Sequence, residues 1–105
     1  MVLILNNIDL IEFEWDKGNM HKSEIKHKIT FRECEQVLLY EPVISEDIKH
    51  SIVEQRYSSI GKTLNGKTLF ISFIIRNNKI RVISDRPADR KEKNFYEKTK
   101  KAAII

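Results

Sequence analysis

Arginine and lysine side chains suited to binding phosphate gather in one stretch of this sequence, residues 79–96. The stretch contains Arg81, Arg86, Arg90 and Lys91. A guanidinium is planar and donates parallel N–H bonds, so it holds phosphate oxygens in pairs, whereas a lysine ammonium acts as a point charge. These residue types at this spacing indicate a surface that binds a polyanion.

The charge of the whole chain is unevenly distributed and supports the same interpretation. Residues 1–75 hold 9 Lys and Arg against 11 Asp and Glu, a balance of −2, whereas residues 76–105 hold 10 against 4, a balance of +6. Concentrated positive charge favours a polyanion or an acidic protein as partner. A helix whose charges are merely solvated is the alternative.

The length and composition describe one globular domain that spans residues 1–105, with 41% hydrophobic and 32% charged residues. No apolar run is long enough to cross a membrane. Asn6, Asn7 and Asp9 interrupt the apolar start, so we expect a strand there and no export signal. The single cysteine, Cys34, allows no internal disulfide and suits a reducing cytoplasm; we expect it to be buried in a helix.

The first half of the chain predicts two short strands and two helices. Apolar patterning predicts strands over 2–5 and 10–15, and Asp16 is suited to cap a helix that runs to His27. Thr30 and Glu33 have the spacing of a capping box for a second helix, in which Ile29 packs against Cys34 and which ends near Tyr40. Residues 41–51 lack periodicity and predict a loop.

The second half predicts three strands joined by hairpin turns, followed by a helix. The strands are expected over 52–60, 68–75 and 79–84, the middle one covered on both faces. Asn65-Gly66 predicts a type I′ turn, and Asn77-Asn78 a second tight turn. A helix is expected from Pro87 to Lys101, with a thin apolar stripe of Ala88, Lys91, Phe95 and Ala102. The order β-α-α-β-β-β-α predicts an α+β fold: an antiparallel sheet with helices on one face or one edge.

Four sequence blocks also resemble the BrnT toxins. They are F-E-W-D at 13–16, K-H-x-I-T-F-R-E at 26–33, R-x-x-x-I-G at 56–61 and R-V-I-S-x-R-x-A-x-R-K-E-x-x-x-Y at 81–96, and the match spans roughly residues 12–97. The resemblance implies a fold similar to the RelE and ParE toxins and a ribonuclease that blocks translation. It also implies a BrnA-like antitoxin, which supplies the DNA-binding part, in a complex of two toxins and two antitoxins. Lys28 and Asp85 depart from the family pattern.

A ribonuclease of this kind needs no metal, because the 2′-hydroxyl of RNA can attack the neighbouring phosphate. We expect Arg56, Arg81 and Arg86 to stabilise the transition state. Tyr96 and His27 are candidates for moving protons, with Glu54 and Glu92 as weaker ones. The remaining basic residues of the stretch, Lys79, Arg90 and Lys91, are expected to bind RNA.

Structural roles stay open for all of these side chains, such as flanking a strand, capping a helix or packing a ring. His21 and His50 have no metal-ligand spacing and there is no Gly-rich phosphate loop, so we expect neither a metal nor a cofactor. The alternative to the enzyme is a basic module, a degenerate toxin, that binds RNA or a protein without cutting it.

Overall fold

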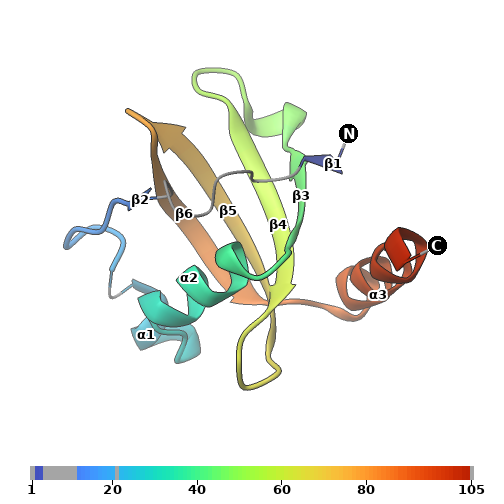
Figure 1. Cartoon of the computed structure of the whole chain (residues 1–105). Coiled ribbons are helices and arrows are strands. Elements are labelled where there is room, and N and C mark those ends of the chain that lie inside the picture. Colours follow the sequence, from blue (N-terminus) through green and yellow to red (C-terminus); the bar gives the residue numbers. More distant parts are fainter. Residues whose placement is uncertain (1, 4–11, 21, 105) are drawn as a thin grey trace.

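The computed structural model describes residues 2–3, 12–20 and 22–104, and these residues form an α+β fold (Figure 1). The elements are β1 (Val2–Leu3), β2 (Glu12–Phe13), α1 (Lys22–His27), α2 (Phe31–Leu39), β3 (Val43–Glu46), the 3₁₀ turn η2 (Ile48–His50), β4 (Arg56–Lys62), β5 (Thr68–Arg76), β6 (Lys79–Pro87) and α3 (Arg90–Ile104). The predicted fold class is therefore confirmed.

The strands form one sheet of six in the order β1-β3-β4-β5-β6-β2. All neighbouring pairs are antiparallel except β2 and β6, which are parallel. The centre of the sheet is the meander β4–β5–β6, because each of its strands follows the last through a short turn (Figure 1). This meander carries most of the candidate site residues.

Both hairpin turns of the meander lie where the sequence predicts them, but the turn type expected at the first occurs at the second. In the fully described loop between β4 and β5, Gly66 alone has a positive φ, 84°, and its N–H donates to Thr63 O at 3.0 Å. The type I′ prediction there is wrong, since such a turn needs positive φ at two successive residues. That geometry occurs instead at Asn77 and Asn78, with φ of 53° and 63°.

The larger hydrophobic core lies between α2 and the sheet. The capping box of Thr30 and Glu33 is present and Cys34 is buried, as predicted; Val37 and Leu38 of the same helix are buried as well. The core also contains buried residues from the strands: Ile44, Leu69, Ile71, Phe73, Ile80 and Val82. This core covers one face of the sheet.

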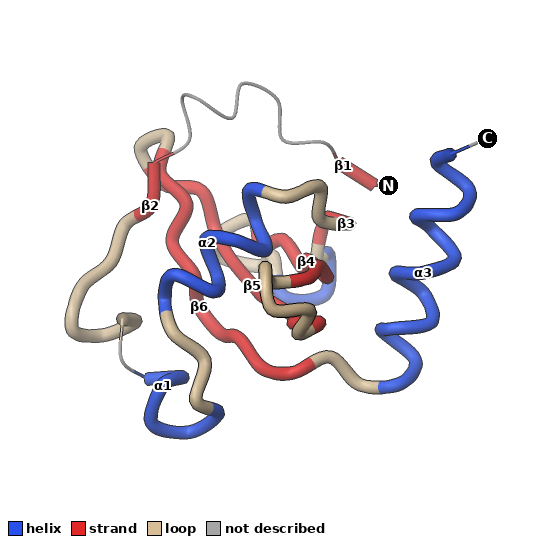
Figure 2. The backbone as a smooth tube through the Cα atoms, turned by 60° about the horizontal axis from the view of Figure 1, so that its bottom comes forward, coloured by secondary structure: helices blue, strands red, loops and turns tan. Residues whose placement is uncertain are grey.

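A second, smaller core lies on the opposite face, beneath α3. It consists of Val43, Ile60, Ala88 and Tyr96, with Phe70 packed against them. In Figure 2, α1 and α2 lie on one side of the molecule and α3 on the other. The helices therefore occupy both sides of the sheet, and the expectation of a single face or edge is wrong.

The connection between α2 and β4 also differs from the prediction. Residues 41–51 contain β3 and η2 rather than only a loop. The four-residue strand β3 has no clear alternation because Val43 is buried in the smaller core and Ile44 in the larger one. The next strand begins at Arg56 instead of position 52, and Val53 is 98% exposed.

The C-terminal helix begins later than predicted. Pro87 is the last residue of β6, and α3 begins at Arg90 after a capping box in which Asp89 and Glu92 accept from each other's N–H at 2.8 Å. Its buried ring is Tyr96, whereas Phe95 of the predicted stripe is 50% exposed.

The strand β2 ends earlier and the helix α1 begins later than predicted. The predicted helix does not begin at Asp16. Instead, the Asp16 carboxylate accepts from Gly18 N–H at 2.8 Å in a turn that precedes the six-residue α1. Lys28, after α1, adopts a φ of 56°. The left-handed conformation expected at this position is therefore present although the residue is not glycine. Residues 4, 5, 10 and 11 of the predicted strands lie outside the described part of the chain.

Candidate functional site

The face of β4–β6 that points away from α2 carries the predicted arginines. In an antiparallel sheet, directly opposed residues point to the same side. The register gives three rows across the strands: Arg56–Ile74–Arg81, Ser58–Ser72–Ser84 and Ile60–Phe70–Arg86. We call the surface formed by these rows the arginine face. The α2 core covers one side of the middle strand. Its predicted burial on both faces is confirmed in part, since on the arginine face Ile74 is 2% exposed and Phe70 packs against the smaller core, whereas Ser72 is half-buried.

Arg56 and Arg81 flank the same residue, Ile74, from the two outer strands. Two strand spacings separate them, about 10 Å between their backbones. Arg86 lies opposite Phe70, four residues along β5 from Ile74 and therefore roughly 13 Å away along the strand. The structure places Arg56 and Arg81 in one row and Arg86 toward the other end of the same face.

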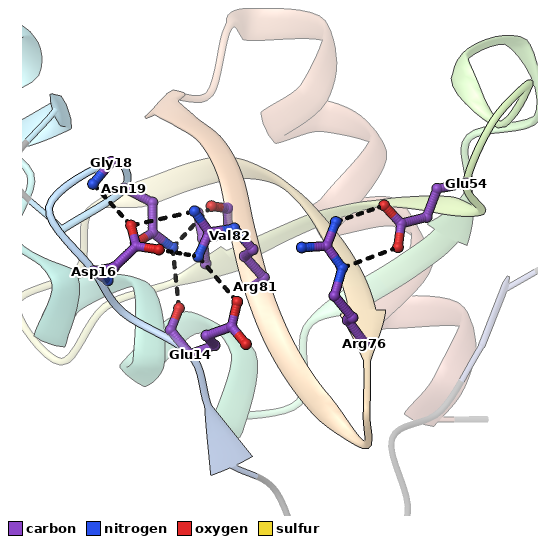
Figure 3. A network of polar contacts seen from close by, with 8 residues as sticks. All are labelled: Glu14, Asp16, Gly18, Asn19, Glu54, Arg76, Arg81 and Val82. Carbon is purple, nitrogen blue, oxygen red and sulfur yellow. Dashed lines mark hydrogen bonds and ion pairs between the residues drawn. The ribbon is translucent and has the colours of Figure 1, made fainter.

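Arg81 is held by two carboxylates (Figure 3). Its Nη1 donates to Asp16 Oδ2 at 2.8 Å and to Glu14 Oε1 at 3.0 Å, and its Nη2 donates to Asp16 Oδ1 at 3.2 Å. The hydrogen bond from Arg81 lowers the pKa of Asp16, and the same bond raises the pKa of the guanidinium. Two negative charges therefore surround one positive charge, which weakens the attraction of this position for phosphate.

Arg86 is also paired, with the first turn of α3. Its two Nη atoms donate to Glu92 Oε1 at 2.7 Å and Oε2 at 2.8 Å, and its guanidinium lies 4.3 Å from the centre of the Phe70 ring. The hydrogen bond to Glu92 raises the pKa of Arg86. This arginine joins the end of β6 to α3 and stacks on the smaller core.

Arg56 has a different environment. Unlike Arg81 and Arg86, it forms no ion pair with any of the described residues. Its side chain lines an open cleft of about 330 Å³ beside Ile74. The other lining residues come from the β3–β4 connection, β5 and β6: His50, Ile52, Val53, Glu54, Arg76 and Ile83. Arg56 therefore offers unpaired N–H donors to a ligand in this cleft.

The second arginine that lines the cleft, Arg76, is paired. Its Nη2 donates to Glu54 Oε1 at 3.0 Å (Figure 3). Glu54, which the sequence suggested as a weaker candidate for proton transfer, is therefore paired with an arginine that also lines the cleft. That hydrogen bond raises the pKa of Arg76.

The remaining predicted residues lie away from this row. Tyr96 is a residue of α3 whose side chain is buried in the smaller core, and desolvation there raises the pKa of its hydroxyl. His27 ends α1 and, within the described residues, makes no hydrogen bond to an arginine of the face. Arg90 and Lys91 are exposed in the first turn of α3, and Lys79 is at the far end of β6 with Glu12 3.9 Å away.

Two of these carboxylates, Glu14 and Asp16, were not predicted from the sequence as partners of Arg81, whereas Glu92 was already a candidate there. Glu92 stands three residues after Asp89, a capping-box spacing that marks the true start of α3. Glu14 and Asp16 are more than sixty positions from Arg81, and no local pattern predicts that pairing. None of the described helices is long and apolar enough to cross a membrane.

Comparison with protein families shows to which family the chain belongs. A family model described as the ribonuclease toxin BrnT of type II toxin–antitoxin systems matches residues 15–92. The chain belongs to this BrnT family. The resemblance identified from the sequence is thereby confirmed, and the matched range contains Arg56, Arg81 and Arg86. Membership of a type II family implies a cognate antitoxin. A search of curated proteins finds no match.

Proposed function

We propose that this BrnT chain is an endoribonuclease that cleaves RNA without a metal ion and so blocks translation in the cytoplasm. The observation that carries the proposal is Arg56, which has no ion-pair partner among the described residues and lines an open cleft on the arginine face. Its planar fork can hold two phosphate oxygens and neutralise the charge that develops when the 2′-hydroxyl attacks. The family description of a ribonuclease toxin supports the same chemistry.

The neighbouring arginines have supporting roles in this proposal. Arg81, between Glu14 and Asp16, holds the segment after β2 against the sheet, and Arg86 holds the start of α3. Because both are paired with carboxylates, neither is free to bind the phosphate bidentately. The proposal leaves Tyr96 out of proton transfer, because its ring is buried and the pKa of its hydroxyl is raised.

Basic residues around the face would bind the RNA backbone. Arg90 and Lys91 are exposed at the start of α3, and Lys79 is exposed at the other end of β6. We further propose that a BrnA-like antitoxin neutralises the toxin in a complex of two toxins and two antitoxins. DNA binding then belongs to the antitoxin alone.

The experiment that tests the proposal incubates the purified chain with labelled RNA in the presence of a chelator. Wild-type protein should cleave, and Arg56→Ala should lower kcat by about 10²–10³-fold, the usual cost of removing one transition-state donor. Arg32→Ala is the matched control, since Arg32 is an exposed arginine on α2 and its removal changes the net charge equally. Equal activity of Arg56→Ala and Arg32→Ala would contradict the site.

A second candidate function is binding without cleavage, as in a degenerate toxin. The observation that favours it is the pairing of Arg81 and Arg86 with carboxylates, which leaves few free catalytic groups among the described residues of the face. The same assay separates the two functions. Salt-sensitive retardation of intact RNA indicates a binding module, whereas appearance of shorter products indicates the enzyme.

A further inference from the structure

A histidine and an aspartate form a close pair at the edge of the arginine face. His50 Nδ1 lies 2.9 Å from Asp47 Oδ2 and 3.1 Å from Oδ1, so the ring N–H donates to the carboxylate. The imidazole is 60% exposed, whereas the carboxylate is 20% exposed. A carboxylate on Nδ1 selects one tautomer and leaves Nε2 as the nitrogen that can accept a proton.

The backbone places this pair in the row of Arg56. The β3–β4 ladder ends with Glu46 opposite Tyr57, and the next N–H, that of Asp47, donates to Arg56 O at 2.8 Å. Asp47 thus stands opposite Arg56. Because opposed residues of an antiparallel pair point to the same side, its carboxylate belongs to the arginine face.

The loop between the two strands is closed around this pair. Ser51 Oγ donates to Asp47 O at 2.6 Å and accepts from Arg56 N–H at 2.8 Å. Asp47 also accepts from His50 N–H at 3.4 Å through its side chain. These bonds set the position of His50 relative to the backbone of Arg56, as a proton-transfer group needs.

His50 and Arg56 line the same cleft. Asp47 contacts the imidazole from its own turn, and the charged groups that line the cleft with His50 are Glu54, Arg56 and Arg76. Glu54 is already paired with Arg76 at 3.0 Å, whereas Arg56 has no ion-pair partner among the described residues. A phosphate held by Arg56 would therefore lie in a cleft that also presents an imidazole.

We propose that His50 is the general base of the cleavage and that Asp47 is its positioning residue, an inference that rests on the proposed ribonuclease function. His50 Nε2 takes the proton of the 2′-hydroxyl while the 2′ oxygen bonds to phosphorus. The bond from phosphorus to the 5′ oxygen breaks, and this oxygen takes a proton from water. The imidazolium then loses its proton to solvent, leaving a 2′,3′-cyclic phosphate and a 5′-hydroxyl end.

The assignment has a local reason as well as a chemical one. Imidazole is the side chain whose unperturbed titration lies closest to neutral pH, which suits a general base. The lack of metal-ligand spacing around His50 does not argue against this role, because a general base needs only one orienting carboxylate. Asp47, three residues earlier in the chain, is that carboxylate.

The test compares RNA cleavage in chelator by the wild-type full chain, His50→Gln, His50→Ala and Asp47→Asn. His50→Gln retains an N–H donor toward Asp47 but cannot accept the proton, so kcat should fall by roughly 10²–10⁴-fold with KM unchanged. Free imidazole should restore part of the activity of His50→Ala and none of that of Arg56→Ala. Asp47→Asn should lower kcat with KM unchanged, because the imidazole remains but is less firmly oriented.

Ile48→Ala is the control, since Ile48 is a 78% exposed residue of the same turn without a titratable group. Thermal melts confirm that each variant is folded. Wild-type-like cleavage by His50→Gln overturns the assignment while the ribonuclease function stands. If imidazole does not raise the activity of His50→Ala, the proton-transfer role is likewise overturned. If the wild-type chain does not cleave RNA, both proposals fall together.

Discussion

Arg81 and Arg86 point to the same face of the sheet although five positions separate them in β6. In a regular strand an odd separation places two side chains on opposite faces. Ser72 pairs with Ser84 but Phe73 pairs with Val82, so β6 has one extra residue, Ile83, at this point. This β-bulge restores both arginines to one side, as bulges near functional sites often do.

The same bulge turns Asp85 away from the arginines. Asp85 stands opposite Ile71 and is 8% exposed, and Cys34 Sγ donates to its Oδ2 at 3.3 Å. The sequence placed this negative charge within the basic stretch and left its direction open. The structure places it in the α2 core, where it contacts a helix residue and does not oppose phosphate binding on the other face.

We predict that the thiol of Cys34 is inert in the native protein. Burial, followed by the nearby charge of Asp85, raises the pKa of the thiol, so almost none of it is thiolate at pH 8. A colorimetric disulfide reagent should therefore react far more slowly with folded protein than with protein unfolded in urea. Native labelling at the unfolded rate would show that the pocket opens readily.

Removal of the Glu92 carboxylate should weaken the junction of β6 and α3. Glu92→Ala loses both the capping box with Asp89 and the bidentate contact with Arg86, so we expect a cost of about 1–2 kcal/mol in urea unfolding. Glu97→Ala is the control. Its carboxylate pairs with Lys62 at 2.9 Å but is 52% exposed, and its loss should cost less than about 1 kcal/mol. Equal costs would argue against the junction.

Stability should fall at acid pH partly through Asp16. The hydrogen bond from Arg81 lowers the pKa of Asp16 in the folded state, so its contribution is fully present above the unfolded value of about 3.9. The contribution is lost as the pH falls through the folded value. Melting temperatures from pH 7 to pH 2.5 should show a smaller acid-induced loss for Asp16→Asn than for wild type.

The exposed carboxylate variant Glu12→Gln provides the comparison for this experiment. Glu12 lies 3.9 Å from Lys79 and is 70% exposed, so it has a weaker partner than Asp16 has. Its pH dependence should follow that of the wild type. A wild-type-like acid curve for Asp16→Asn would instead show that the bond to Arg81 does not contribute to stability.

Gly61 is predicted to be essential for the approach of α2 to β4. A Cβ at this position would lie 2.9 Å from Val37 Cγ1, a distance that forces one element to move. Gly61→Ala should therefore destabilise the fold by about 1–3 kcal/mol. Because Val37→Ala removes the clashing methyl, the double variant should lose less than the sum of the two single losses, by about 0.5–3 kcal/mol. Additive losses would place the strain elsewhere.

Features that depend on neighbouring residues were predictable from the sequence. The capping box of Thr30 and Glu33, the burial of Cys34, the α+β class and the family all follow from short-range patterns. The same patterns misplaced β3 and the starts of β4 and α3. Val43 and Ile44 serve two different cores, and a local alternation rule cannot describe a strand buried on both sides.

The candidate site shows the same division. The sequence by itself determined which arginines are available and that Arg81, Arg86 and Arg90 cluster in the last third of the chain. Only the tertiary structure decided that Glu14 and Asp16 neutralise Arg81, that Arg56 stays unpaired among the described residues, and that Asp47 stands opposite Arg56. The physical reason is strand register: one extra residue in β6 reverses which side chains share a face, and register is set by long-range pairing and packing.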